Sequence, residues 1–250
     1  EAGEEHTAFY RLDLRGGEAQ KAFEVPLSAS LLEKADEGVY LLAVDWDLRF
    51  SKAHQLKGGA KEALLKEKKE EKDYQVLDEM PFYFNGAGYV NKHRDALFLY
   101  EESSGKLTRV TKEAFSTGSA HLSPDGKQVL FTGQSYTVKR KNKSGVYVYD
   151  RETGRTTELL KPRAYDLYDA LWWGEKILLL ATDGKRYGLN ENAQFYTLNP
   201  ASGEVALLAP YEDALGSSVG SDCRLGGGRE WVQEGDKLYF VTTLGGASQV

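Results

Sequence analysis

The stretch Val146-Tyr147-Val148-Tyr149-Asp150-Arg151-Glu152-Thr153-Gly154 decides the fold of this chain. Its apolar run is typical of a β-strand. The acidic residue and glycine that follow are typical of a tight turn, because glycine readily adopts the positive φ that such turns require. Residues Arg155-Thr156-Thr157-Glu158-Leu159 then return as a second strand. The stretch therefore predicts a β-hairpin with Gly154 at its corner.

The same hairpin recurs along the chain. Its other copies begin at Phe9-Tyr10-Arg11-Leu12-Asp13, Leu97-Phe98-Leu99-Tyr100-Glu101 and Phe195-Tyr196-Thr197-Leu198-Asn199. In every copy a glycine lies seven residues after the second position, which gives the corners Gly17, Gly105, Gly154 and Gly203. The last three glycines are evenly spaced, since 154 − 105 and 203 − 154 both equal 49. A fixed period of this kind indicates a repeat fold.

A second type of hairpin alternates with the first. Its turns are Ser123-Pro124-Asp125-Gly126, Trp173-Gly174 and Glu234-Gly235-Asp236, with a degenerate copy at Asp36-Glu37-Gly38. Two hairpins in each repeat give four strands, and a repeated four-stranded sheet is typical of a propeller blade. We therefore predict an all-β chain, a β-propeller of four-stranded antiparallel blades in which about four to five blades or part-blades are present.

The repeat predicts one β-propeller domain or fragment over residues 1–250. Its expected parts are a part-blade at 7–27, a blade at 30–110 with an insertion at 52–73, blades at 115–160 and 165–209, and a part-blade at 217–250. The half-blades at the two ends leave two arrangements open: a four-bladed ring closed by joining them, or a fragment of a longer propeller. An open fragment would expose sheet edges, which pair with other chains, so a homo-oligomer is a possible partner state.

The insertion is indicated by the spacing between Gly17 and Gly105, which exceeds one repeat because 105 − 17 is 88 and the period is 49. Within it, residues 61–72 are rich in strong helix formers, and Glu62 and Lys66 stand at helical i,i+4 spacing. We expect one short, solvated surface helix there. The alternative is that this helix acts as a lid or contacts a partner.

Composition excludes several classes of function. The net charge is −6, and the nearest basic block, residues 139–143, lies between two strand-like runs, so a solvated loop is expected and no nucleic-acid binding. Cys223 is the only cysteine, which excludes a disulfide framework and allows a reducing compartment, so we expect a cytoplasmic protein. No apolar run approaches a membrane span, and no membrane partner is expected.

No chemical site emerges from the sequence, so we predict no catalytic, cofactor-binding or metal residues. Gly216-Ser217-Ser218-Val219-Gly220 matches the nucleophile turn of hydrolases, but no histidine follows Ser218. The four histidines are scattered and are expected in loops or at the surface (His6, His54, His93 and His121). Gly86-Ala87-Gly88 is a weak phosphate-binding signal. The pair Trp172-Trp173 is expected to pack between neighbouring blades, with ligand stacking as the alternative.

One segment carries a family resemblance. Residues 73–89, which read DYQVLDEMPFYFNGAGY, resemble the segment preceding a blade hairpin in the prolyl oligopeptidase family of serine peptidases, most closely in its acylaminoacyl-peptidase branch. The turn Ser123-Pro124-Asp125-Gly126-Lys127 resembles a blade turn of the same family, although other propellers also contain it. The resemblance extends loosely along most of the chain.

The resemblance implies a propeller of seven or eight blades that covers an α/β-hydrolase domain, and that domain would be the partner of this region. The hydrolase domain would hold the catalytic residues, none of which can be carried over to this chain. The expected function is therefore a non-catalytic propeller that gates the access of short peptides, and we expect the chain alone to hydrolyse no peptide.

Two alternatives come from other classes of function. One is a stand-alone binding module for a protein or a small ligand, since propellers serve many functions. The other is a propeller enzyme with a site on its central channel, but the sequence reveals no acidic or histidine cluster to support it.

Overall fold

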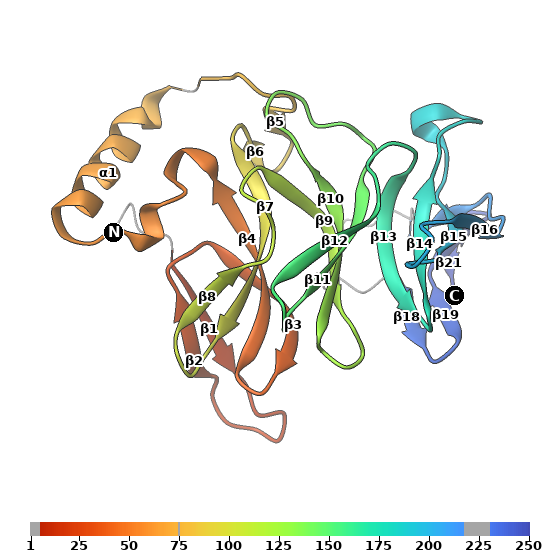
Figure 1. Cartoon of the computed structure of the whole chain (residues 1–250), viewed down its shortest axis with the longest axis horizontal. Helices are drawn as coiled ribbons and strands as arrows, with labels where there is room; N and C mark the ends of the chain where they lie inside the picture. Colours follow the sequence, from red (N-terminus) through yellow and green to blue (C-terminus); the bar gives the residue numbers. More distant parts are fainter. Residues whose placement is uncertain (1–5, 75, 218–230) are drawn as a thin grey trace.

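The computed structural model describes residues 6–74, 76–217 and 231–250, and antiparallel β-sheets dominate it (Figure 1). Three sheets have four strands each. Their strands are, in chain order, β3 (Ala29–Asp36), β4 (Val39–Asp47), β7 (His93–Glu101) and β8 (Lys106–Arg109); β9 (Phe115–Leu122), β10 (Gln128–Ser135), β11 (Gly145–Asp150) and β12 (Arg155–Leu160); and β13 (Asp166–Trp173), β14 (Lys176–Thr182), β15 (Gln194–Leu198) and β16 (Val205–Ala209).

Each of these sheets is a meander in which successive strands are neighbours. The first strand of the middle blade, β9, lies against the first strands of the other two, β3 and β13, so the three sheets adjoin at their inner edges. Sheets of four antiparallel strands arranged in this way are the blades of a β-propeller, as the repeat predicts.

Shorter sheets flank the three complete blades. At the N-terminal end, β1 (Thr7–Arg11) pairs with β2 (Gln20–Val25). At the other end, β18 (Trp231–Glu234) pairs with β19 (Lys237–Phe240). The strand that follows, β20 (Thr242–Leu244), pairs on one side with β17 (Ala214–Leu215) and on the other with β21 (Ala247–Gln249).

The excursion between β4 and β7 is the longest connection between strands of one blade. Its elements are η1 (Leu48–Phe50), η2 (Ala53–Gln55), α1 (Gly58–Glu70), η3 (Glu71–Asp73), β5 (Tyr83–Phe84) and β6 (Gly88–Tyr89). Helix α1 is the expected helix and has no buried residue; Lys66 pairs with Glu70 at 3.7 Å. No helix in the described part of the chain is long and apolar enough to cross a membrane.

The corner glycines occupy matching positions in the three blades. Gly105, Gly154 and Gly203 join the third strand of each blade to the fourth and have φ values of 67°, 68° and 72°. Gly126 and Gly174 join first strands to second strands, with φ values of 69° and 57°. These positive φ values explain the spacing of glycine in the sequence, because side chains with a Cβ are strained there.

The hydrophobic core lies between blades. On the N-terminal side, Phe23 of β2 stacks on Tyr40 and Tyr100 at ring distances of 4.6 and 4.7 Å. Between the third and last sheets, Trp173 packs with Phe195 and Phe240; between the second and third, Trp172 packs against aliphatic residues of both. The tryptophan pair therefore lies between neighbouring blades, as expected.

Two glycine substitutions test the packing of the blades. A Cβ on Gly126 would lie 2.6 Å from the carbonyl oxygen of Ala35 in the neighbouring blade, whereas a Cβ on Gly174 would meet nothing within 4 Å. Both substitutions carry the strain of a positive φ, which costs about 1–2 kcal/mol. Gly126→Ala should therefore lower the free energy of unfolding in urea clearly more than Gly174→Ala. Equal losses would contradict the contact between these blades.

Candidate functional face and channel lining

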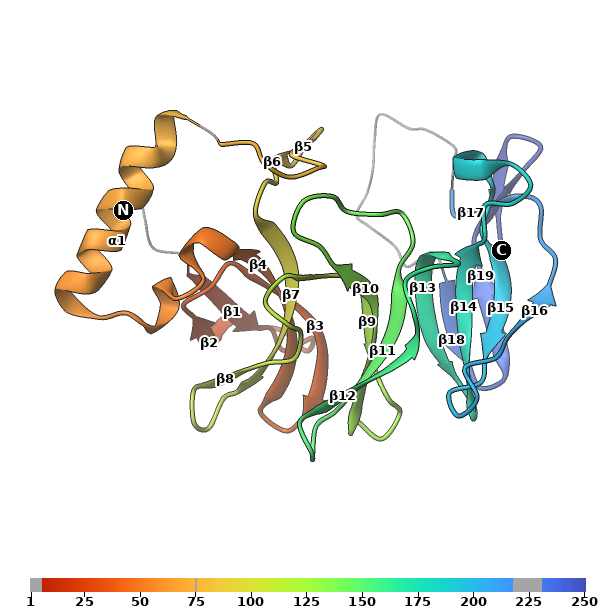
Figure 2. The same ribbon diagram turned by 45° about the horizontal axis from the view of Figure 1, so that its top comes forward.

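The two faces of the propeller differ in the kind of connection they carry. The glycine-cornered hairpins lie on one face, whereas the connections from second to third strands lie on the other (Figures 1 and 2). We call the second face the loop face and define it by residues 48–92, 136–144 and 183–193. Because binding residues concentrate on loops held by a rigid scaffold, the loop face is the first candidate surface for function.

A buried ion pair fixes part of the loop face. Arg94 at the start of β7 and Glu79 in the preceding segment are 1% and 3% exposed. The two terminal nitrogens of the Arg94 guanidinium, Nη2 and Nη1, donate to the two oxygens of the Glu79 carboxylate at 2.7 and 3.0 Å. Burial raises the pKa of Glu79, but the bonds from Arg94 and from the Lys92 amide more than offset this, and the pKa lies below its ordinary value.

Further bonds tie the same segment to the next blade. The Met80 amide donates to the carbonyl oxygen of Val138 at 2.8 Å, and the Arg140 amide donates to that of Met80 at 2.8 Å. The guanidinium of Arg94 also donates to the Tyr136 carbonyl at 3.0 Å and lies over the Tyr136 ring. Residues 79–94 and the β10–β11 loop therefore form one supported unit, and this unit includes most of the segment on which the family resemblance rests.

The inner strands carry a second polar cluster, which joins three blades. His121 on β9 contacts Asp169 on β13 through Nε2 at 2.9 Å and Glu33 on β3 through Nδ1 at 3.2 Å. Trp231 on β18 donates from Nε1 to Asp169 at 2.7 Å, and the Leu122 amide donates to Glu33 at 3.1 Å. The cluster therefore links neighbouring blades across their inner edge.

The charge of His121 follows from these contacts. Burial lowers the pKa of His121, but the hydrogen bonds to Asp169 and Glu33 raise it by more than burial lowers it. The resulting pKa is about 9. The imidazole is thus a cation at neutral pH, and both of its nitrogens donate to carboxylates. A histidine in this state has no free lone pair to accept a proton or a metal ion, so the cluster is a structural link between blades. Among the described residues, no group of three or more acidic, histidine or cysteine side chains is arranged to hold a metal ion.

A groove of about 610 Å³ runs along the inner strands beside this cluster. Its polar lining consists of Asp95, Thr117, Ser119, His121, Arg140, Asp169, Tyr168 and Trp231. Arg140 comes from the loop face, so the groove reaches from the His121 cluster toward that face. This mixed lining of donors, acceptors and aromatic rings can hold a peptide backbone or another small polar molecule.

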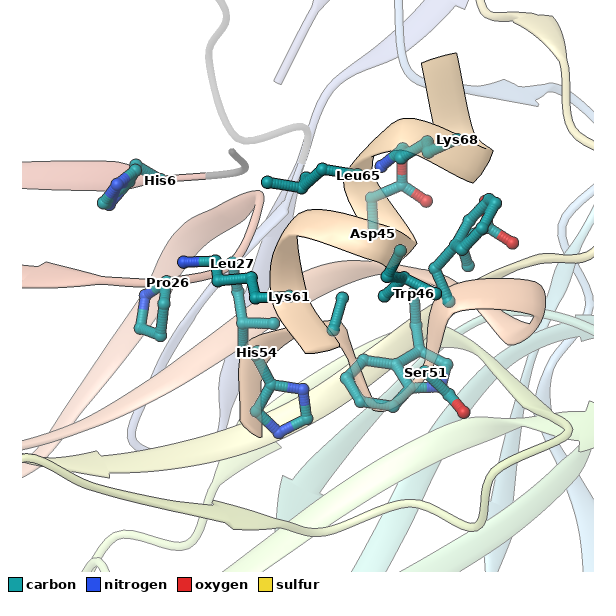
Figure 3. A pocket seen from close by; sticks show the side chains of 14 residues that line it. His6, Pro26, Leu27, Asp45, Trp46, Ser51, His54, Lys61, Leu65 and Lys68 are labelled. Carbon is teal, nitrogen blue, oxygen red and sulfur yellow. The ribbon is translucent and has the colours of Figure 1, made fainter. Parts of the chain in front are cut away.

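A smaller pocket of about 80 Å³ lies beneath α1 (Figure 3). Figure 3 places Lys61, Leu65 and Lys68 of the helix around it with Trp46 of β4 and His54 of η2. The guanidinium of Arg109 lies 4.3 Å from the Trp46 ring, and burial lowers its pKa to about 10. The pocket is too small for a peptide; Leu64 and Leu65 of α1 line it together with Trp46 of the first complete blade.

The structure places two of the histidines and corrects one expectation about them. His93 and His121 lie in strands, each keeps about 30% of its side chain exposed, and each contacts two carboxylates. A histidine and acidic cluster is also present on the inner strands, although the sequence was interpreted as having none. Gly86 and Gly88 form the β5–β6 turn with φ values of 86° and 77°. Ser218 and the rest of its glycine-flanked motif from residue 218 onward lie outside the described residues.

The residues of the cluster share a position in the repeat. Glu33, His121 and Asp169 each stand five residues before the glycine that follows the inner strand, since 38 − 33, 126 − 121 and 174 − 169 all equal 5. Sequence reasoning missed them because it examined the histidines alone. An alignment of the repeats on these glycines would have placed the three residues at the same position of the inner strand.

No protein-family model matches this chain, and no curated protein matches its sequence. Among solved structures, the acylaminoacyl peptidase of Pyrococcus horikoshii is similar over 95% of this chain and 33% of its own, at 17% identity and a TM-score of 0.58. A prolyl endopeptidase is similar over 96% of this chain and 29% of its own, at 14% identity and a TM-score of 0.53. An oligogalacturonate lyase in complex with manganese is similar over 96% of this chain and 51% of its own, at 16% identity and a TM-score of 0.52.

This chain thus spans about a third of the length of the first peptidase. At identities of this level, similarity establishes the β-propeller fold alone. The lyase match demonstrates this point, because proteins with different activities share the fold.

The pKa of His121 gives a test of the inner cluster. A folded pKa of about 9 above the ordinary 6.5 means that the cluster stabilises the fold fully below about pH 6.5 and loses this effect as the pH rises through about 9. The difference in free energy of unfolding between wild type and His121→Gln should therefore shrink over that interval.

His54→Gln is the matched control, because burial lowers the pKa of His54 and its imidazole stays neutral over the same interval. The difference in free energy of unfolding between His54→Gln and wild type should therefore stay constant over this pH interval. Urea titrations at several pH values measure both differences, and a level His121→Gln difference would contradict the cationic bridge.

Proposed function

We propose that this chain is the non-catalytic propeller of a serine peptidase of the prolyl oligopeptidase type, of the acylaminoacyl-peptidase-like branch. In this proposal an α/β-hydrolase domain of the same parent chain is its partner, and short peptides are the substrates. The carrying observation is that the segment resembling this family, residues 73–89, is held on the loop face by the buried pair Glu79–Arg94. The fold shared with the Pyrococcus peptidase over 95% of this chain supports the same proposal.

The mechanism would be a size filter. A propeller placed over the hydrolase active site leaves narrow routes to it, so short or unfolded peptides enter and folded proteins do not. Coverage also excludes bulk water from the site. The groove along β3, β9 and β13 offers one such route, since the polar side chains in its mixed lining can form transient hydrogen bonds with a peptide. We include a cytoplasmic location in the proposal, with which the single Cys223 is compatible.

The proposal is tested with the entire product of the reading frame that contains this chain. That product should hydrolyse short chromogenic peptides, and a serine-directed inhibitor should abolish the activity. For peptides of increasing length, kcat/KM should fall steeply, and a folded protein should resist cleavage. The 250-residue chain alone, assayed in parallel, should show no turnover.

Two results would contradict the proposal in different ways. Absence of serine-dependent hydrolysis by the entire product would favour the stand-alone binding module. Hydrolysis that is equally efficient for long and short peptides would leave a peptidase but remove the size filter.

A further inference from the structure

A cavity of about 320 Å³ lies between the first two complete blades and shares no lining residue with the inner groove or with the pocket beneath α1. One wall belongs to the connection from β8 to β9 and includes Lys112, and a second belongs to the outer strand β12 and includes Glu158. The rings of Phe115, Phe131 and Tyr147, from β9, β10 and β11, form the floor. An aromatic floor with a few polar groups on the walls is typical of a small-molecule site.

The three rings of the floor are held in a fixed arrangement. Phe131 and Tyr147 are cross-strand partners whose rings stack at 5.4 Å, and Phe115 meets them edge to face at 5.5 and 5.2 Å. Two paired glycines make room for the rings, since a Cβ on Gly133 would lie 2.6 Å from the Phe115 ring and one on Gly145 would lie 2.7 Å from the Tyr147 hydroxyl. Glycine within a strand marks a place where another group approaches closely. The floor is therefore preorganised, which lowers the entropy lost on binding.

The wall that carries Lys112 is fixed through its backbone. The guanidinium of Arg109 donates to the carbonyl oxygens of Thr111 and Lys112 at 2.8 and 3.1 Å. The Phe115 amide also donates to the Lys112 carbonyl at 3.0 Å. Lys112 itself is exposed, so the wall presents a positive charge on a fixed backbone.

The wall on β12 carries the opposite charge. Glu158 is the cross-strand partner of Tyr147, and its carboxylate accepts a hydrogen bond from the Tyr147 hydroxyl. Burial and the negative charge of Glu158 raise the pKa of Tyr147 to about 12, so this hydroxyl stays a donor. Because a carboxylate has about four lone-pair positions, Glu158 can accept from a ligand as well. Among the described residues, neither Lys112 nor Glu158 belongs to an ion pair.

These charges and rings together favour a zwitterion with an aromatic side chain. A ligand with a positive group alone is repelled by Lys112, and a ligand with a negative group alone is repelled by Glu158. A free amino acid carries both groups. The volume of about 320 Å³ is at the lower end of the range for small-molecule sites, which suits a single amino acid.

We infer that this cavity is a binding site for a free aromatic amino acid, whose ammonium binds Glu158, whose carboxylate binds Lys112 and whose ring lies against Tyr147. The inference goes beyond the proposed function and does not depend on it, because every residue of the site belongs to this chain.

Calorimetric titration of the 250-residue chain tests the inference, with L-phenylalanine as the probe. N-acetyl-L-phenylalanine lacks the ammonium and L-phenylalaninamide lacks the carboxylate; each should bind about tenfold more weakly, because it loses one charged hydrogen bond. L-alanine keeps both charges but has no ring, and it should also bind about tenfold more weakly. Absence of L-phenylalanine binding at about 10 mM, or equal affinities for the three aromatic probes, would overturn the inference.

Charge variants locate the ligand within the chain. Glu158→Gln should abolish the preference for L-phenylalanine over its N-acetyl form and keep the preference over its amide. Lys112→Met should do the reverse. Each preference compares two ligands on the same protein, so a general loss of stability cannot produce this pattern. Unchanged preferences in both variants would place the amino acid elsewhere and overturn the inference.

Glu152→Gln is the matched control. Glu152 is an exposed acid in the turn of the same β11–β12 hairpin, where it lies 3.5 Å from Lys127. It does not line the cavity, so both preferences should equal those of the wild type. A preference altered by Glu152→Gln as strongly as by Glu158→Gln would contradict the assigned site.

Discussion

The rest of this structure depends on one constraint: both faces of each blade are apolar and must be buried. The central strands demonstrate it. In β4, Leu41 packs toward the second blade and Leu42 toward β1 and β2, and in β14, Leu179 and Leu180 divide in the same way. Successive residues of a strand point to opposite faces, so strands buried on both sides are nearly continuous apolar runs. Sheets of this kind are stable only when they stack face against face.

Radial stacking leaves two kinds of surface for function. Inner edges line the groove along β3, β9 and β13, where buried polar groups require partners, and His121 satisfies this requirement for Asp169 while also contacting Glu33. The connections are unequal, because the tight hairpins need only glycine corners whereas the loop face carries long segments. The Glu79–Arg94 pair gives this face a fixed shape. Together these features support the proposal of a propeller that covers a second domain and filters its substrates.

The fold could be predicted from the sequence, because the glycine corners and apolar runs are local signals. The expected surface helix is likewise confirmed, since its signal is composition. The inner cluster could not be found in this way, because its charged residues lie up to 136 positions apart, from Glu33 to Asp169, and meet only when three blades stack. The Glu79–Arg94 pair was missed for a different reason: Glu79 lies in the segment 73–89, which was considered only for its family resemblance, and Arg94 lies outside that segment.

Nitrogen NMR of the His121 side chain in the wild-type chain tests the central claim, which is that three separate sheets converge at their inner strands. The account predicts that both imidazole nitrogens are protonated at neutral pH and that the ring loses its proton only near a pH of about 9. A neutral ring at pH 7.5 with a pKa near 6.5 would contradict it, because His121 would then lack the two carboxylates that only stacked blades bring together.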